Sequence, residues 1–185
     1  MVLCSRSKRI KGVSYLMSES LTQQIPLFQP ESNWIAPEKF PDLSQAKIIA
    51  VDLETYDPNI KEYGPGWATG RGHIIGVAVA TEDYKGYFPT RHHGGGNIDE
   101  QMVFDWLKKT MALPCDKVMH NAAYDVGWMK SIGININGRI LDTMIAAPLI
   151  DENMYSYSLD NLAKHYLQER KDERLLRRAA DEFGR

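Results

Sequence analysis

The chain has 185 residues, enough for one compact domain with a hydrophobic core. Hydrophobic residues make up 43% and charged residues 25%, which is close to the average of globular proteins and argues against wholesale disorder. The formal net charge of -2 decides nothing about nucleic acid, because enzymes that hold cations through carboxylates are often acidic. No apolar run approaches the roughly 18 residues that a membrane-spanning helix needs.

The first 45 residues are predicted to be a lead-in segment that is partly disordered. Residues 1–16 contain four basic residues and no acid, and they lack the apolar stretch of a secretory signal. They form either a basic extension or an upstream start that precedes Met17 as the true initiator. The segment that follows is polar and rich in proline, which predicts an extended path on the surface of a domain spanning residues 46–185.

Three strands are predicted in the first half of this domain. Residues 47–54 form an apolar run of strand-forming residues, which indicates a strand buried on both faces. Residues 57–72 are rich in glycine and proline and are predicted to be a long loop. Strands at 73–80 and 85–89 follow, and the turn residues between them predict an antiparallel hairpin.

Helices dominate the second half. A helix is predicted to begin at Asn97, with Glu100 completing a capping box. A short strand at 117–120 follows, and Asn121 is predicted to cap a helix that ends near Gly133.

Three more helices are predicted before the end of the chain. Asp142 caps the first, which Pro148 should kink or end; Ser158 starts an amphipathic second, and residues 175–183 form the third. This order of elements predicts an α/β domain with a mixed β-sheet covered by helices.

Asp52 and Glu54 stand at the end of the first strand. Because strand side chains alternate between faces, both carboxylates point to the same side, roughly 7 Å apart along the strand. Two like charges there repel each other, and a divalent cation such as Mg²⁺ or Mn²⁺ would relieve the repulsion. The alternative is that the strand simply ends at the surface and water solvates both groups.

A second group of polar residues lies about seventy positions later. Asn121 and Asp125 are four residues apart at the start of a helix, so they are predicted to share one helix face. A helix N-terminus favours a nearby acid or phosphate. Taken singly, Asn121 is also explained as a helix cap and Asp125 as an acid of the first turn.

Together these two groups resemble the DEDD exonuclease superfamily, and most closely the proofreading 3′-5′ exonuclease domains of family A DNA polymerases. The resemblance runs from about Lys47 to Leu167, and Val-Asp-Leu-Glu-Thr at 51–55 is its most specific string. The glycine-rich stretches 64–67 and 94–97 are most similar to phage-type polymerases. The resemblance implies a ribonuclease-H-like fold, in which a mixed sheet is flanked by helices.

The resemblance also implies chemistry with two divalent metal ions, Mg²⁺ or Mn²⁺, which activate a water and stabilise the leaving 3′ oxygen. It assigns catalysis and metal binding to Asp52, Glu54 and Asp125, and substrate contact to Thr55, Asn121 and Tyr124. Tyr124 would pack against the sugar or base of the terminal nucleotide, although an ordinary core aromatic residue is the alternative. Asp142 is expected to be a helix cap and not a ligand.

One part of the family's pattern is missing. The superfamily has a fourth Asp, four residues after a Tyr or five after a His, and no residue pair after Asp125 fits this spacing. We therefore expect a fragment of a larger DNA polymerase, incomplete at the C-terminus, with little Mg²⁺-dependent activity of its own. The expected partners are a single-stranded DNA 3′ end and a polymerase domain in the same chain, in the cytoplasm of a bacterial or phage-infected cell. Two alternatives remain, a stand-alone RNA exonuclease similar to ribonuclease D and an inactive remnant that binds single strands.

Overall fold

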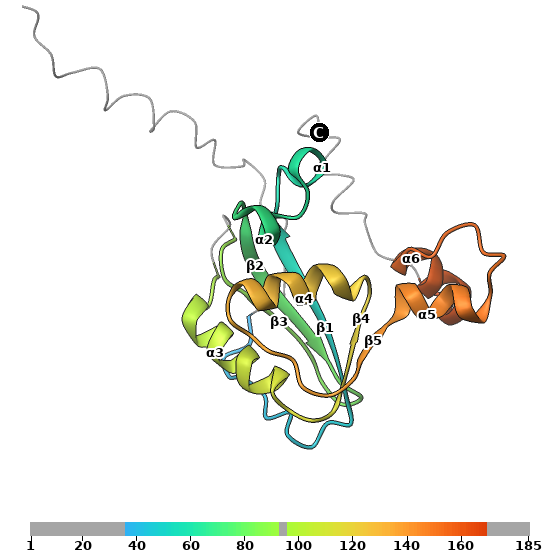
Figure 1. The fold of residues 1–185 in the computed structure, drawn as a ribbon. Coiled ribbons are helices and arrows are strands. Elements are labelled where there is room, and N and C mark those ends of the chain that lie inside the picture. Colours follow the sequence, from blue (N-terminus) through green and yellow to red (C-terminus); the bar gives the residue numbers. More distant parts are fainter. Residues whose placement is uncertain (1–35, 93–95, 170–185) are drawn as a thin grey trace, which may run out of the picture. The chain divides into compact units, whose positions relative to one another are not determined.

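The structure, a computed structural model, describes residues 36–92 and 96–169. Its centre is a five-stranded mixed sheet with strand order β3-β2-β1-β4-β5 (Figure 1). The strands are β1 (Ile48–Tyr56), β2 (His73–Ala80), β3 (Lys85–Pro89), β4 (Asp116–Met119) and β5 (Ile140–Asp142). β2 is antiparallel to β1 and β3, whereas β4 is parallel to β1 and β5, so the predicted α/β class with a mixed sheet is confirmed.

Seven helical segments connect or follow these strands in the described residues. They are α1 (Ile60–Tyr63), α2 (Gly66–Thr69), α3 (Glu100–Met111), α4 (Ala122–Ser131), α5 (Thr143–Ile150), α6 (Leu159–Leu162) and the π-helix η1 (Ala163–Leu167). Of these described helices, none is long and apolar enough to cross a membrane.

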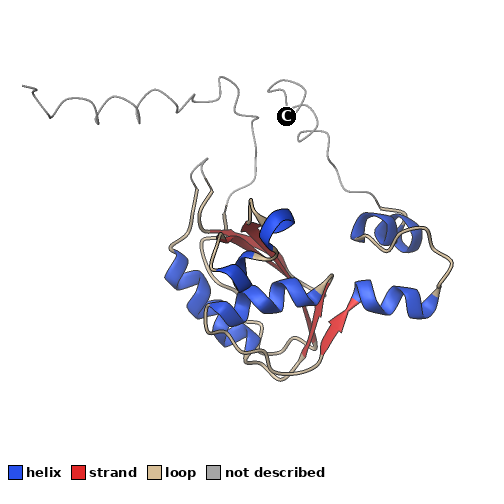
Figure 2. Cartoon of the chain, turned by 45° about the horizontal axis from the view of Figure 1, so that its top comes forward, coloured by secondary structure: helices blue, strands red, loops and turns tan. Residues whose placement is uncertain are grey.

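The core lies between the sheet and the two helices α3 and α4 (Figure 2). On β1 the side chains of Ile49, Val51 and Leu53 point into it, each at most 6% exposed. The apolar residues of α3 are buried against the same face, with Val103 and Leu107 inaccessible to solvent. Because alternate strand residues point oppositely, this packing leaves the even-numbered residues of β1 on the other face.

The segment before β1 joins this core. Leu43 is 7% exposed and belongs to the core cluster, and the ring of Phe40 stacks on Phe88 and Trp106. The Trp106 Nε1–H donates a hydrogen bond of 3.1 Å to the Pro41 carbonyl. The basic segment 1–16 and the predicted helix 175–183 lie outside the described residues.

Two predicted elements differ from the structure in the first half. Residues 57–72 are not a plain loop, because they contain the single-turn helices α1 and α2. The α3 helix is capped by Asp99, whose carboxylate accepts from the Met102 N–H at 2.9 Å, and not by Asn97. The Asn97 side chain instead bonds the backbone of His92 in the preceding loop.

Differences in the second half have local causes. The short strand β5 was not predicted, because Ile140 and Leu141 are exposed and too few to form an apolar run. Ser158 caps α6 as predicted. Of the apolar leucines in this amphipathic segment, Leu162 is buried, whereas Leu159 and Leu167 are exposed. Asp142 caps α5, and that helix ends at Ile150, two residues beyond Pro148.

Candidate active site

Asp52 and Glu54 lie on the face of β1 that α3 and α4 do not cover. Both side chains are exposed, and they point to the same side, as their spacing predicts. Their partners across the β1–β2 pair are Ala78 and Gly76, and the missing side chain of Gly76 makes room for the ring of Tyr87 beside Glu54.

A cavity of about 680 Å³ lies on this face. Its walls are Ala50, Val51, Asp52, Ala78, Val79, Ala80, Lys85, Gly86, Tyr87, Val118, Met119, His120, Thr143 and Leu159. Small residues (Ala50, Ala78, Ala80 and Gly86) alternate in this lining with polar side chains, among which Asp52 is the acidic one. Such a surface is typical of a binding site.

Asp125 approaches the same strand from α4. Its side chain is 3% exposed, and its Oδ1 accepts a hydrogen bond of 2.9 Å from the backbone N–H of Leu53. Burial raises the pKa of Asp125 to about 6; the Leu53 hydrogen bond opposes this effect, and the negative charge of Asp52 adds to it. A desolvated carboxylate next to another carboxylate is a place where a cation would be strongly favoured.

The chemistry of these three carboxylates fits a hard divalent cation, because Mg²⁺ and Mn²⁺ prefer oxygen ligands. Within residues 36–92 and 96–169, however, no group of three or more His, Cys, Asp or Glu side chains is gathered closely enough to hold one ion. The structure thus brings Asp52, Glu54 and Asp125 to one strand end without forming a closed ligand shell. Repulsion between the like charges of these carboxylates favours keeping them apart.

Thr55 and Tyr124 are brought into direct contact. The Thr55 Oγ1 and the Tyr124 hydroxyl are 2.8 Å apart, which links the end of β1 to the first turn of α4. The Tyr124 hydroxyl also donates to Asp57 Oδ2 at 3.1 Å, and the same oxygen accepts from the Gly66 N–H at 2.8 Å. Sequence reasoning missed Asp57, because nothing in a loop acid announces a partner sixty-seven residues away.

Asn121 occupies the N-cap position of α4, but its side chain makes no capping hydrogen bond, so that prediction is wrong. The residue has a left-handed backbone with a φ of 66°, and its backbone N–H donates to Asp142 Oδ1 at 3.0 Å. Asp142 also accepts from Ala122 at 2.8 Å and from Met144 at 2.9 Å. One carboxylate from β5 therefore caps both α4 and α5.

Asn121 and Asp125 also differ in environment, since Asn121 is exposed and Asp125 is buried. For Asp142, burial would raise the pKa, but hydrogen bonds from Ala122, Met144 and Asn121 N–H groups lower it overall. A carboxylate stabilised in its ionised form by three backbone donors is well suited to fix the helix that carries Asp125.

Tyr87 is a further residue beside the carboxylates that sequence reasoning did not assign to the site. It pairs with Ala78 in the row that includes Asp52, and its ring lies so close to Gly76 that a Cβ there would be 2.0 Å from the phenol oxygen. The hydroxyl is 2.5 Å from His92 Nε2. Burial, together with the negative charges of Glu54 and Asp52, raises the pKa of Tyr87 to about 12, so the phenol stays protonated.

His120 lines the same cavity in a defined orientation. The Thr143 hydroxyl donates to the Met119 carbonyl at 3.2 Å, and its oxygen lies 2.9 Å from His120 Nδ1. Because the single hydrogen of that hydroxyl goes to the Met119 carbonyl, the His120 Nδ1–H is the donor of this second bond.

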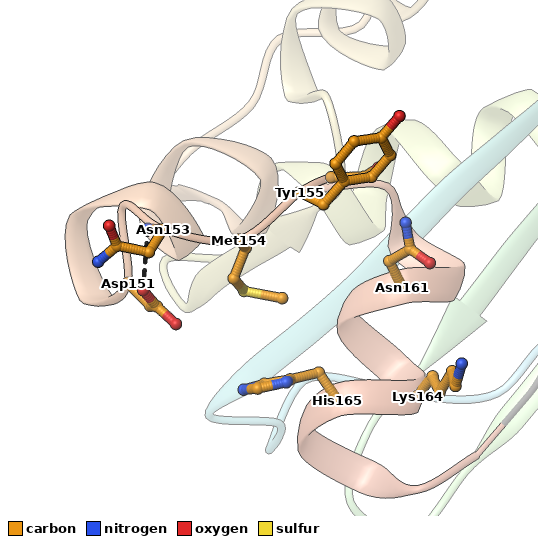
Figure 3. A pocket seen from close by; sticks show the side chains of 8 residues that line it. Asp151, Asn153, Met154, Tyr155, Asn161, Lys164 and His165 are labelled. Carbon is orange, nitrogen blue, oxygen red and sulfur yellow. Dashed lines mark hydrogen bonds between the residues drawn. The ribbon is translucent and has the colours of Figure 1, made fainter.

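A second cavity, of about 590 Å³, is lined by residues between Asp151 and His165 (Figure 3). Asp151 Oδ1 accepts from the Asn153 N–H at 2.9 Å, and Tyr155, Asn161 and Lys164 complete much of the wall. It shares no lining residue with the carboxylate cavity, and its only carboxylate is Asp151. None of the predicted site residues lines this second cavity.

Comparison with known proteins fits this geometry. The model of a 3′-5′ exonuclease family of A-type DNA polymerases matches residues 36–181. The chain belongs to this family. The DNA-directed DNA polymerase of Pseudomonas phage M6 is 38% identical over 171 residues, which are 87% of this chain and 26% of that polymerase.

Solved structures of other exonucleases share the fold of this exonuclease domain. Brucella melitensis NrnC with bound Mg²⁺ matches with a TM-score of 0.54 at 16% identity. The matched region is 72% of this chain and 60% of the NrnC chain. Escherichia coli RNase D matches with a TM-score of 0.50 at 14% identity. The matched region is 71% of this chain and 30% of the RNase D chain. The expected ribonuclease-H-like fold is confirmed.

Proposed function

We propose that this chain is the 3′-5′ exonuclease domain of a larger DNA polymerase and that it removes nucleotides from the 3′ end of single-stranded DNA. The observation that carries the proposal is the Leu53–Asp125 hydrogen bond, which joins the strand bearing Asp52 and Glu54 to the helix bearing the third carboxylate. The phage polymerase relative, of which the chain spans 26%, supports a polymerase domain elsewhere in the full-length protein. The domain boundary at residue 46 stays a prediction, as does a bacterial or phage-infected cytoplasm.

Asp52, Glu54 and Asp125 are the residues that would hold two divalent ions, Mg²⁺ or Mn²⁺. Such ions, when bound, supply an activated water and charge stabilisation of the leaving 3′ oxygen. The NrnC structure, which shares the fold, has Mg²⁺ bound. Leu53 contributes through its backbone, because its N–H holds Asp125 Oδ1 toward the strand.

Thr55, Asn121 and Tyr124 are proposed to contact the terminal nucleotide. Tyr124 offers an aromatic ring at the start of α4, and an aromatic face accepts any base, which suits an enzyme that must remove whichever nucleotide is last. The ring is half-buried and meets Trp128 edge-on, with centroids 6.4 Å apart, so its position is fixed before a strand binds.

The runner-up function is RNA degradation of the ribonuclease D kind. The shared fold with RNase D keeps it open, since contacts to a 2′-hydroxyl decide between DNA and RNA. The polymerase relative favours DNA. A protein that only binds single strands is the third reading, because the sequence after Asp125 lacks the Tyr- or His-spaced fourth Asp.

The test is a cleavage assay with DNA and RNA oligonucleotides of one sequence, labelled at the 5′ end, in Mg²⁺, Mn²⁺ or EDTA. We expect slow, metal-dependent shortening of the DNA from its 3′ end, lost in Asp52→Ala and retained in Asp83→Asn, which alters an exposed acid of the β2–β3 turn. Faster shortening of RNA would favour the runner-up. Cation-independent binding without any product would favour the binding protein, and brisk cleavage by this chain would contradict the need for a fourth carboxylate.

A further inference from the structure

Asp57, Tyr124 and Thr55 form a chain of hydrogen bonds whose direction can be worked out from their chemistry. An ionised carboxylate only accepts hydrogen bonds, and a backbone N–H only donates them. Asp57 Oδ2 accepts from the Gly66 N–H at 2.8 Å, so this oxygen is fixed as an acceptor. The Tyr124 hydroxyl, 3.1 Å away, must therefore use its single hydrogen toward Asp57.

The hydrogen bond from Tyr124 to Asp57 determines the direction of the bond between Tyr124 and Thr55. With its hydrogen given to Asp57, the Tyr124 oxygen can only accept from Thr55, whose Oγ1 lies 2.8 Å away. The Thr55 hydrogen is then also used, and Thr55 Oγ1 is left with acceptor lone pairs alone. The carboxylate of Asp57 thus sets the hydrogen-bonding character of a hydroxyl that immediately follows Glu54.

The anchor of this chain is rigid. Gly66 is buried, and a Cβ at that position would lie 1.8 Å from the Arg71 carbonyl oxygen. Trp67 packs so closely on α4 that a Cβ at Gly127 would lie 2.3 Å from its indole ring. Helix α2 therefore fixes Asp57 with respect to the helix that carries Tyr124.

We propose that Asp57 is a positioning residue that makes Thr55 Oγ1 an acceptor for the 3′-hydroxyl of the bound strand. The proposal rests on the proposed function, which places Thr55 beside the terminal nucleotide. It adds a specificity: an end that donates a hydrogen bond is preferred, and an end of similar size that only accepts is disfavoured. If the 3′ group can only accept, it faces the accepting Thr55 Oγ1 without a hydrogen bond, and the two negative partial charges repel each other.

The experiment compares oligonucleotides that end in a 3′-hydroxyl or a 3′-fluorine, because fluorine is similar in size but cannot donate. Binding to the whole chain is measured by fluorescence anisotropy in Ca²⁺, and the recovered oligonucleotide is checked for cleavage. We expect the hydroxyl end to bind about tenfold more tightly, the size of one lost hydrogen bond with an unsatisfied acceptor. Any effect of fluorine on the sugar itself is common to all variants.

Four variants separate this role from a purely structural one. Thr55→Val and Tyr124→Phe should reduce the preference to about twofold or less, the first by removing the acceptor and the second by freeing the Thr55 hydrogen to turn. Asp57→Ala should do the same. Asp57→Asn keeps an oxygen that accepts from Gly66 and Tyr124, so it should keep the preference. Its NH₂ group takes the place of the buried Oδ1, which has no hydrogen-bond partner, and this buried donor should lower the stability of the variant.

The outcomes are distinct. Tyr124→Phe leaves the Asp57–Gly66 bond in place, so it tests the idea even if Asp57→Ala does not fold. An equal preference in wild type, Tyr124→Phe and Asp57→Ala, or no preference in wild type, overturns the role of Asp57 and leaves the exonuclease assignment standing. A chain that binds neither end contradicts both, and Asp83→Asn should behave as wild type throughout.

Discussion

The backbone N–H of Leu53 donates a hydrogen bond of 2.9 Å to the carboxylate of Asp125. Leu53 points its side chain into the core, whereas its neighbours Asp52 and Glu54 point to the open face. The bond therefore draws a buried acid to the position where two exposed acids emerge. Holding that acid charged in a desolvated place is unfavourable for folding, which gives the first prediction.

Asp125→Asn should raise the free energy of unfolding in EDTA by about 1–2 kcal/mol at neutral pH. The Asn oxygen can still accept from Leu53, while the buried charge is removed. Burial raises the pKa of Asp125 from an ordinary value of 3.8 to about 6, so the native state holds the proton more tightly. Stability of the wild type should fall as pH rises from about 4 to about 6.

The measurement is urea unfolding of both proteins across this range and below it. The gain from Asp125→Asn should be complete above about pH 6 and vanish below about pH 3, where the carboxyl is protonated in both states. Asp83→Asn, at an exposed turn, should show no such trend. Because EDTA removes divalent cations, a variant that is less stable than wild type at neutral pH would contradict the idea that the buried charge of Asp125 is unfavourable for folding.

Asp142→Ala should destabilise the chain by about 2–3 kcal/mol, because it removes the acceptor of N–H groups from Asn121, Ala122 and Met144 together. The pKa of Asp142 is lowered, so its contribution is present above the ordinary carboxyl pKa of 3.8 and is lost as pH falls below it. Thermal unfolding at neutral and acid pH would show both effects.

Asp99→Ala is the matched control for this prediction, since Asp99 caps only one N–H, that of Met102. It should cost about 1 kcal/mol. Equal losses in the two variants would show that Asp142 does not join α4 to α5.

The strand of Asp52 and Glu54 could be predicted because the apolar run and the alternation of side chains are local properties of the chain. The helical position of Asp125 could also be predicted, because the residue comes shortly after a predicted strand, at the start of the next predicted helix. The cap that Asp142 supplies to α5 was predicted, but its bonds to the start of α4 and the role of Asp57 were not, because these partners are brought near only by the folded sheet. The same holds for Asn121, where a cap supplied from β5 replaces the local one that sequence favours.

Lys117→Met should lower the free energy of unfolding by about 3 kcal/mol. Lys117 is completely buried on β4, and its Nζ donates to the carbonyls of Leu113, Cys115 and Asn137 at 2.7 to 2.9 Å. Methionine fills a similar volume but removes the donor of all three hydrogen bonds. Chemical denaturation measures the loss, and Lys109→Met, on the exposed side of α3, should change stability by less than about 0.5 kcal/mol.

Gly76→Ala tests the contact that holds Tyr87 next to the carboxylates. An added Cβ would lie 2.0 Å from the phenol oxygen and 2.4 Å from Cζ, so the ring must move away from the Glu54 row and leave His92. We expect a loss of about 2 kcal/mol from this overpacking. In a Tyr87→Ala background the obstacle is gone, and the same substitution should then be nearly neutral, which a double-mutant cycle measures.

Gly86 provides the matched control for that cycle. A Cβ there would meet the hydroxyl of Tyr84 at 2.3 Å, a clash of the same kind that does not involve Tyr87. Gly86→Ala should therefore destabilise the protein equally in the wild-type and Tyr87→Ala backgrounds. If Gly76→Ala also loses the same stability in both, the ring of Tyr87 is not what occupies the space over Gly76, and its placement beside Glu54 is wrong.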